Sequence, residues 1–452
     1  MQMDGHTIRS RLLREPGIYA NKKLLIVLVV ISIALATDVA LWNLSMITTL
    51  PSAWSVPLFF ILTSVFAIVQ YPILAFIREN NKNIMVKTSS QGVNILAIVI
   101  QSVLTAILVF AAIQISSTAQ YNTIILSIIS TISYAVGITV MSILSFLLFS
   151  WYKLSKSLVV LMYSMSAVAI SLALLILTVQ TDVAIAGLPP ERNSLSEVKG
   201  FFELGTTLGN VQYVGAVTNA VSFFLLWFST ALLLRYYARK MGVAKFWLVM
   251  SIPLISLINQ YVVVTPIVAS ITNPDMIVYV QIFGNVLPGI VGGILFGLPF
   301  WLVARTIDNN AIRNYMIIAM WGSIFLQLTG SGAAFVAAYP PFGVFCVFFT
   351  GLACYLILIG IYSSAASISG NATLRKSIKK FALEETRLLD NIGMAKMEQE
   401  VKSKVLQITK EKSDLMAKQS GVDPALTEED AGRYLADVLN ELKKDKTGNT
   451  TK

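Results

Sequence analysis

The chain has 452 residues, of which 56% are apolar or aromatic and 13% are charged, and its mean hydropathy is +0.72. These values are typical of membrane proteins and exclude a soluble enzyme. Residues 373–452 contain 16 Lys and Arg and 14 Asp and Glu, whereas residues 1–372 contain 18 and 10. The sequence therefore predicts an all-α, polytopic membrane protein with a charged helical tail.

The apolar segments follow a short basic N-terminal segment, residues 1–23. A helix needs about 20 mostly apolar residues to cross the hydrocarbon layer. Ten segments meet this requirement and predict a transmembrane domain over residues 24–362. They are Leu24–Trp42, Val56–Ile77, Val93–Ile115, Thr123–Phe149, Leu158–Val179, Ala216–Leu234, Phe246–Val264, Ile277–Val303, Tyr315–Val336 and Val344–Tyr362.

The first segment also resembles a secretory signal, because Lys22 and Lys23 precede an apolar run that contains the small-residue triplet Ala34-Leu35-Ala36. The charged region before it is unusually long for a signal peptide. We therefore expect an uncleaved membrane anchor, with cleavage as the alternative.

The basic residues predict the orientation of the spans. With the N-terminus inside, the inner segments before the tail contain 16 Lys and Arg, and the outer loops contain only Arg192 and Lys199. This asymmetry predicts a multi-pass protein of the cell (plasma) membrane with both termini in the cytoplasm. The net charge of +10 then reflects attraction to the inner leaflet, so we expect the lipid bilayer, and no nucleic acid, as its partner.

One outer loop, residues 180–215, is much longer than the others. After Pro189-Pro190, apolar residues recur at helical spacing and predict a short amphipathic helix on the outer face: Leu195, Val198, Phe201 and Phe202. This helix would either close over an outward-facing cavity or rest on lipid and neighbouring spans.

Polar side chains within the spans are few, and most are amides. The predicted orientation places Asn259, Gln260, Gln281, Asn285 and Gln327 in the outer half or middle of the bilayer, with Asp38 near the outer end of the first span. Amides in hydrocarbon need polar partners. They would either form a small ligand-binding pocket or bond to one another between helices.

The eighth span contains a repeated glycine spacing, Gly289, Gly293 and Gly297, between Pro288 and Pro299. Small residues four apart favour close packing against another helix. The alternative is a broken helix that coordinates an ion or substrate.

The cytoplasmic tail, residues 363–452, begins with a basic collar that we expect to contact lipid headgroups: Arg375, Lys376, Lys379 and Lys380. Two seven-residue patterns follow, offset by one residue near Gly393: Leu374, Phe381, Leu388 and Ala395, then Met394, Val401, Ile408 and Leu415. They predict two amphipathic stretches with a hinge, which form a short coiled coil or fold back on the membrane domain.

The sequence predicts a last amphipathic helix that begins with a capping box at Thr427 and Asp430. We expect residues 373–442 as a whole to bind a protein partner or a second copy of the chain.

Residues for catalysis are scarce. His6, Cys346 and Cys354 are the whole stock of histidine and cysteine, and neither paired aspartates in facing spans nor a Gly-x-x-x-x-Gly-Lys loop is present. The sequence therefore predicts no catalytic site, no metal and no cofactor, and a protein that is not an enzyme.

Five stretches of the tail carry a further pattern: Tyr362 to Ser367, Leu374 to Ile378, Glu385 to Gly393, Met397 to Glu400 and Leu426 to Glu429. In these stretches the tail resembles that of an uncharacterised multi-spanning membrane protein family of ammonia-oxidising archaea. Some members are labelled kinase-like, but we expect no kinase domain here, because too few residues follow the tail. The resemblance implies a shared tail module and transfers no active site.

Together these features predict a membrane sensor or signalling scaffold. Its spans would receive an outer-face, lipid-phase or partner input, and the last span would relay this input to the tail helices. A secondary transporter of a small solute is the main alternative, although the third span contains neither the Gly nor the Pro that an inverted repeat of the eighth would have. A structural subunit of a membrane complex is the other.

Overall fold

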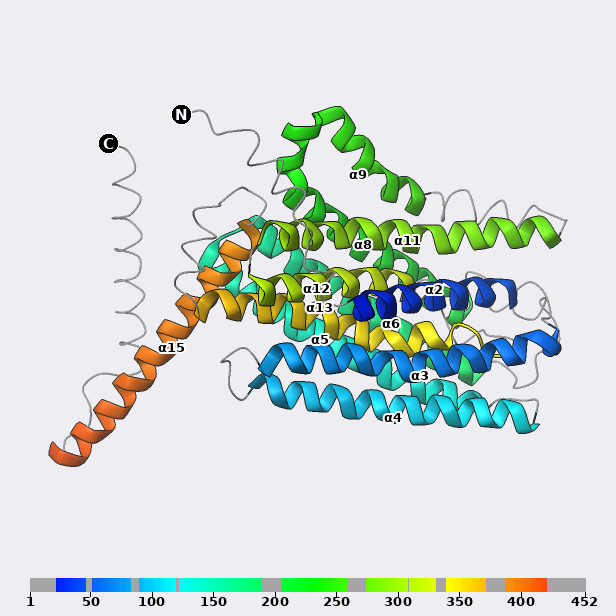
Figure 1. Cartoon of the computed structure of the whole chain (residues 1–452), viewed down its shortest axis with the longest axis horizontal. Coiled ribbons are helices and arrows are strands. Elements are labelled where there is room, and N and C mark those ends of the chain that lie inside the picture. Colours follow the sequence, from blue (N-terminus) through cyan, green and yellow to red (C-terminus); the bar gives the residue numbers. More distant parts are fainter. Residues whose placement is uncertain are drawn as a thin grey trace.

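The computed structural model describes residues 22–45, 51–82, 89–118, 122–187, 205–258, 274–307, 309–330, 339–370 and 387–420, and within these ranges it contains helices and no strand. The helices, labelled as in Figure 1, are α2 (Lys22–Ser45), α3 (Ser52–Lys82), α4 (Ser89–Thr118), α5 (Thr123–Ser155), α6 (Leu158–Gly187), α8 (Thr207–Met241), α9 (Val243–Ile258), α11 (Pro274–Thr306), α12 (Asn310–Thr329), α13 (Val344–Gly370) and α15 (Arg387–Ser420).

Eight described helices are long and apolar enough to cross a membrane: α2, α3, α4, α5, α6, α8, α11 and α13. The all-helical, multi-pass character predicted from the sequence is thereby confirmed. Among the described residues the number of such helices is eight, however, where the sequence predicted ten. The two predicted segments that do not qualify, Phe246–Val264 and Tyr315–Val336, correspond to α9 and α12.

The two differences have separate physical reasons. Helix α9 has 16 residues, so at 1.5 Å per residue it is about 24 Å long and shorter than the hydrocarbon layer of about 30 Å. Residues 259–264 of the predicted segment lie outside the described residues. Helix α12 has 20 residues, but its hydropathy is lowered by Asn310, Arg313, Asn314 and Gln327.

Helix α12 nevertheless runs along the bundle between α11 and α13. Pairs of contacts fix its direction, because Gly293 of α11 faces Ile324 and Gly297 faces Met320. Gly360 of α13 likewise faces Ala319. The residue numbers rise on α11 as they fall on α12, so the two helices are antiparallel. Gly322 of α12 contacts Leu356 and Ile357, so α12 is antiparallel to α13 as well.

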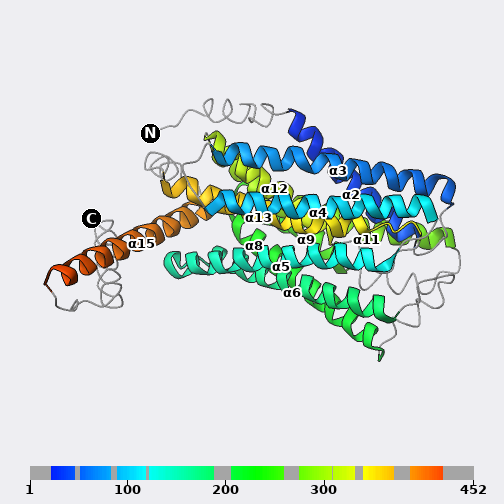
Figure 2. The ribbon, with the colours of Figure 1, turned by 90° about the horizontal axis from the view of Figure 1, so that it is seen from below.

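Helix α13 occupies the centre of the bundle, with α3, α4, α5 and α12 around it in both views (Figures 1 and 2). Its most apolar 18-residue stretch is completely buried, whereas the corresponding stretches of the other seven membrane-capable helices are 33% to 56% buried. A helix that is apolar on every side can be buried on every side. Small residues let its neighbours approach, as at Gly351, where an added Cβ would lie 2.9 Å from the carbonyl oxygen of Ser133 in α5.

Serine hydroxyls connect α5, α6 and α8. Ser145 and Ser164 exchange hydrogen bonds with each other's backbone carbonyls at 3.1 and 3.0 Å. Ser166 and Ser229 share a hydrogen bond of 3.1 Å between α6 and α8. Such bonds between apolar helices are worth about 0.6 kcal/mol each and fix which faces meet.

Several helices extend past their predicted ends. Helix α6 continues to Gly187 and α8 begins at Thr207, so the connection between them is shorter than the predicted loop of residues 180–215. The amphipathic helix predicted inside that loop lies outside the described residues. Helix α13 continues from the predicted Tyr362 to Gly370, which brings its last two turns to α15.

We call the end of the bundle where α13 meets α15 the tail end, and the opposite end, where α13 begins, the distal end. Helix α15 leaves the tail end obliquely and extends away from the other helices (Figures 1 and 2). It runs without a break through Gly393, so the hinge predicted at this glycine is not present in α15.

Candidate functional site: the central helix and its two ends

At the distal end, Asp38 of α2 caps the first turn of α13. Its side chain is fully buried, and its two carboxyl oxygens accept hydrogen bonds from the backbone N–H groups of Gly343, at 2.7 Å, and Cys346, at 2.9 Å. The first N–H groups of a helix have no partner within the helix, and a helix start carries partial positive charge. The carboxyl group of one span therefore satisfies two buried backbone donors at the start of another.

Gly343 makes this geometry accessible. Its φ angle is +92°, in the region that favours glycine, and α13 starts at the next residue. The Cys346 thiol also points at α2, with its sulfur 3.8 Å from the carbonyl oxygen of Leu35. Two helices that are distant in sequence are thus joined by a buried polar contact.

Below this cap, a phenylalanine cluster fills the space between α3, α12 and α13. Phe66 stacks on Phe345 with ring centroids 5.2 Å apart, and Phe59 lies 4.9 Å from the same ring. Phe325 of α12 meets Phe349 edge-on at 5.3 Å. All five rings are fully buried, and each such pair adds about 0.5–1.5 kcal/mol beyond its burial. The cluster leaves α13 little freedom to shift independently of α3 and α12.

At the tail end, the first turns of α15 dock on α13, α5 and α6. Leu389, Ile392 and Ala395 are buried in this contact. The closest approach is at Gly393, where an added Cβ would lie 2.3 Å from Cγ2 of Ile368 and 2.9 Å from its Cβ. Only a glycine lets the two helices pass at this distance.

Polar contacts flank the docked turns. The Asn391 amide donates to the Ser157 hydroxyl at 3.0 Å, and the Ser369 hydroxyl donates to Glu400 at 3.4 Å. The Lys396 ammonium lies 5.4 Å from the ring centre of Tyr362 and 3.8 Å from Glu400. These directional bonds give the docked turns a defined register.

On its side away from the bundle, from Met394 in the docked turns onward, α15 presents an apolar face that the described residues leave exposed. Met394, Val401, Val405 and Ile408 are 37% to 53% exposed and recur at helical spacing. Three of them belong to the second seven-residue pattern of the sequence; its fourth member, Leu415, lies in α15. Of the first pattern, Ala395 is in the buried contact.

The remaining predicted site residues are placed as follows. Gln327 lies on the α12 face toward α11, where its side-chain oxygen would be 3.4 Å from a Cβ at Gly292. Gln281 and Asn285 belong to α11, whereas Asn259, Gln260 and the basic collar, Arg375, Lys376, Lys379 and Lys380, lie outside the described residues. Asp38 accepts its hydrogen bonds from Gly343, just before α13, and from Cys346 in α13, rather than from these amides.

The glycines of α11 lie at its contact with α12. Added Cβ atoms at Gly293 and Gly297 would each come within 3.1 Å of backbone atoms of α12, and Gly289 is buried in the same helix. Helix α11 is continuous past Pro288 and Pro299. The repeated glycine spacing thus coincides with close packing of α11 against α12, and α11 itself is unbroken.

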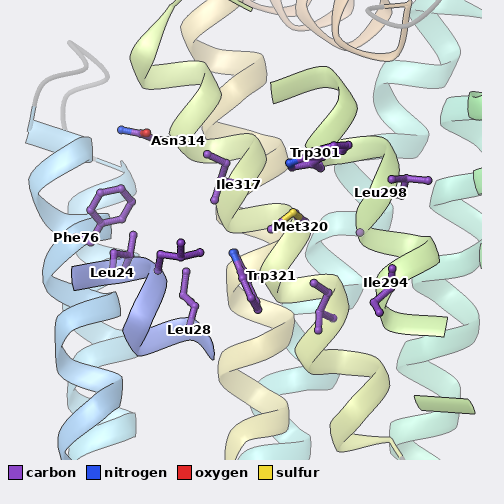
Figure 3. Close-up of a pocket in the computed structure, with 13 residues that line it drawn as sticks. Leu24, Leu28, Phe76, Ile294, Leu298, Trp301, Asn314, Ile317, Met320 and Trp321 are labelled. Atoms are coloured by element: carbon purple, nitrogen blue, oxygen red, sulfur yellow. The ribbon is translucent and has the colours of Figure 1, made fainter. Parts of the chain in front are cut away.

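A cavity of about 490 Å³ lies at the tail end between α2, α3, α11 and α12. Apolar side chains from all four helices line it, among them Leu24, Phe76, Leu298, Trp301 and Trp321 (Figure 3). In the close-up, Leu24, Leu28 and Phe76 face Ile317, Met320 and Trp321 across the space.

The comparisons with known proteins add no family to this geometry. No protein family model, curated protein or solved structure matches the chain.

The described residues also contain no group of three or more His, Cys, Asp and Glu side chains that could hold a metal ion. What the arrangement provides is a mechanical connection: a central helix capped at one end by α2 and contacted at the other by α15. The sequence contained a signal for the central helix, because a helix formed by Val344–Tyr362 is apolar on every side, which is the pattern of a helix buried on all sides.

Proposed function

We propose that this protein is an integral membrane sensor or signalling scaffold, in which α13 transmits a change in the membrane domain to the tail helix α15. The observation that carries the proposal is the contact between Ile368 and Gly393, because it joins the last turns of the central helix to α15 without an intervening side chain. A shift of α13 along or about its axis must therefore move or release α15.

The burial of α13 supports a relay over a passive anchor. A helix in contact with lipid can shift without disturbing its neighbours, but α13 is enclosed by packed side chains. Packed interiors are not continuously deformable, so small displacements favour a discrete change of arrangement. Contacts of α13 with α2, α3, α4, α5 and α12 give such a change many places to begin.

The exposed face of α15 supports the output side of the proposal. We propose that the tail end faces the cytoplasm of a cell whose plasma membrane holds the bundle, as the distribution of Lys and Arg predicts. The face formed by Met394, Val401, Val405 and Ile408 would then be available to a protein partner or to a second copy of the chain.

The test compares two helix caps at the distal end. Asp38→Asn weakens the cap of α13, and Thr206→Ala removes the cap of α8, where the Thr206 hydroxyl accepts a 3.0 Å hydrogen bond from the Gly209 N–H. Among the described helices, the main contacts of α15 are with α13, α5 and α6. Hydrogen exchange of the amides of residues 388–397 should therefore increase in the full-length Asp38→Asn protein and stay unchanged in Thr206→Ala.

An equal change in both variants would indicate general loosening of the bundle and contradict a relay through α13. No change in either variant would show that the two ends of α13 are uncoupled. Solute flux in vesicles that persists after deletion of residues 373–452 would instead favour the transporter alternative.

A further inference from the structure

The cavity at the tail end has a strongly asymmetric lining. Most of its wall is aliphatic or aromatic, from Leu24, Leu25 and Leu28 of α2 to Ile317, Met320 and Ile324 of α12. The polar lining side chain, Asn314, lies at the same end of the cavity as Trp301 in the close-up, on the opposite side, with Ile317 between them (Figure 3). An occupant that fits this lining has a long apolar part and a polar end near Asn314 and Trp301.

A cation is held at this polar end. The guanidinium carbon of Arg305 lies 4.6 Å from the ring centre of Trp301, which forms part of the cavity wall. Stacking on the indole positions the charge at the rim of the cavity. Arg305 is exposed, so an additional ligand can approach it.

The helix ends around this rim are predominantly basic. Arg78 lies in the last turns of α3, and Arg313 is in the first turn of α12. Among the described side chains at these helix ends, the acidic one is Glu79 in α3. The side-chain Nε of Arg313 is buried and has no hydrogen-bond partner in the described structure. The excess positive charge favours an anionic end group.

The cavity also opens toward the lipid-facing surface. Ile294 lines it and is 59% exposed, and Ile26, next to the lining residue Leu25, is 61% exposed. At about 30 Å³ per water-sized group, 490 Å³ holds on the order of 16 such groups, which is the size of a single lipid chain. A chain can therefore enter sideways from the bilayer.

From this geometry we infer a binding site for an acidic phospholipid. One acyl chain lies in the cavity between α2, α11 and α12, and the phosphate headgroup lies beside Arg305 and Trp301 at the tail end. Charge complementarity selects this occupant over a neutral lipid, because each Lys or Arg near the headgroup region favours an anionic lipid. The site goes beyond the proposed relay and exists whether or not α15 transmits a signal.

The experiment is native mass spectrometry of the full-length protein in neutral detergent. Phosphatidylglycerol and phosphatidylcholine with identical acyl chains are added in equal amounts, and the first bound lipid is measured. We expect the acidic lipid to predominate severalfold. Arg305→Gln should reduce its adduct about fivefold and leave the neutral adduct unchanged, as expected for the loss of one favourable charge. Arg305→Lys should retain most of the preference.

Matched controls separate the site from general effects. Arg235→Gln removes an exposed charge from the last turns of α8, away from the cavity lining, and should change nothing. Leu25→Trp fills the cavity and should reduce binding of both lipids, whereas Ile26→Trp on the adjacent exposed position should not. Ile294→Trp, at the mouth of the cavity, repeats the filling test at a position where the fold tolerates a larger side chain.

Each possible result bears on the inference. Equal binding of both lipids, or equal loss of both in Arg305→Gln, would contradict the headgroup site. Unchanged binding in both Leu25→Trp and Ile294→Trp would show that the chain lies elsewhere. A lipid-free dimer that Leu25→Trp dissociates would replace the lipid with a second copy of the chain. Lipid binding is measured independently of hydrogen exchange in α15, so the lipid site can be refuted while the proposed relay through α13 is retained.

Discussion

Replacing Gly393 by alanine is a test in which two physical effects have opposite signs. Alanine in place of glycine inside a helix stabilises that helix by about 1 kcal/mol. At this position, however, the new Cβ would lie 2.3 Å from Cγ2 of Ile368 and 2.9 Å from its Cβ. These atoms are at or next to the branch point of a β-branched side chain, which is stiff. They cannot move aside without a change of rotamer or backbone.

The magnitudes decide the expected direction. Overpacking of a close contact costs about 1–3 kcal/mol, and the alanine regains about 1 kcal/mol of helix propensity. The free energy of docking of α15 should therefore weaken by about 0–2 kcal/mol. The upper limit corresponds to a roughly 30-fold smaller docking equilibrium constant. Hydrogen exchange of the amides of residues 388–397 in the full-length protein should become faster by up to that factor.

The control and the compensating variant make the result specific. Ser403 is exposed on α15, so Ser403→Ala adds helix propensity without a contact and should leave exchange of residues 388–397 unchanged. Ile368→Ala alone leaves a space and weakens docking, but together with Gly393→Ala the loss should be smaller than the sum of the two. Slower exchange in Gly393→Ala would refute the close contact, because helix propensity would then be the only effect.

Three further predictions concern the packing around α13, each measured as thermal stability of the purified full-length protein. Asp38→Asn should cost about 1–3 kcal/mol, because one backbone donor of α13 loses its buried acceptor; an unchanged midpoint would contradict the cap. Gly360→Ala should lower stability by about 1–3 kcal/mol, since its Cβ would lie 2.6 Å from the Cβ of Ala319. Its control is Gly215→Ala in α8, where the nearest atoms are at 3.4 Å and the change should be neutral or stabilising by up to about 1 kcal/mol. Ser133→Ala should cost about 1 kcal/mol, because Ser133 donates to one backbone group of α13 at 2.6 Å and accepts from another at 3.1 Å. Equal stability of wild type and Ser133→Ala would argue that these bonds are replaced elsewhere.

Sequence periodicity predicted most of the membrane-crossing helices because their apolar length is a local property. The two predicted spans at α9 and α12 are not confirmed among the described residues, because residues 259–264 and 331–336 of these spans lie outside them. In α12, Arg313 and the amides lower the hydropathy, but antiparallel packing between α11 and α13 places the helix along the bundle. Such packing depends on residues far apart in the chain and has no local signal.

The candidate site was less predictable for the same reason. Asp38 was recognised as an unusual polar residue of the first span, but its partners are backbone N–H groups some 305 and 308 residues further along the chain. Backbone groups carry no residue-specific signal in a sequence. The tail glycine Gly393 was recognised as special and interpreted as a hinge, because glycine is compatible with a break, a turn or a close contact. Only the position of Ile368 distinguishes these roles.

The enclosure of α13 has a consequence for biosynthesis. It is the last of the eight membrane-capable helices to be translated, yet apart from its last turns, where α15 docks, it is covered by segments made before it. The earlier helices consequently enter the bilayer with an unfilled middle and with the Asp38 carboxyl group lacking its two amide donors. Chains stalled before residue 344 should therefore be recognised by quality control as incomplete, even though seven of their eight membrane-capable segments are already inserted.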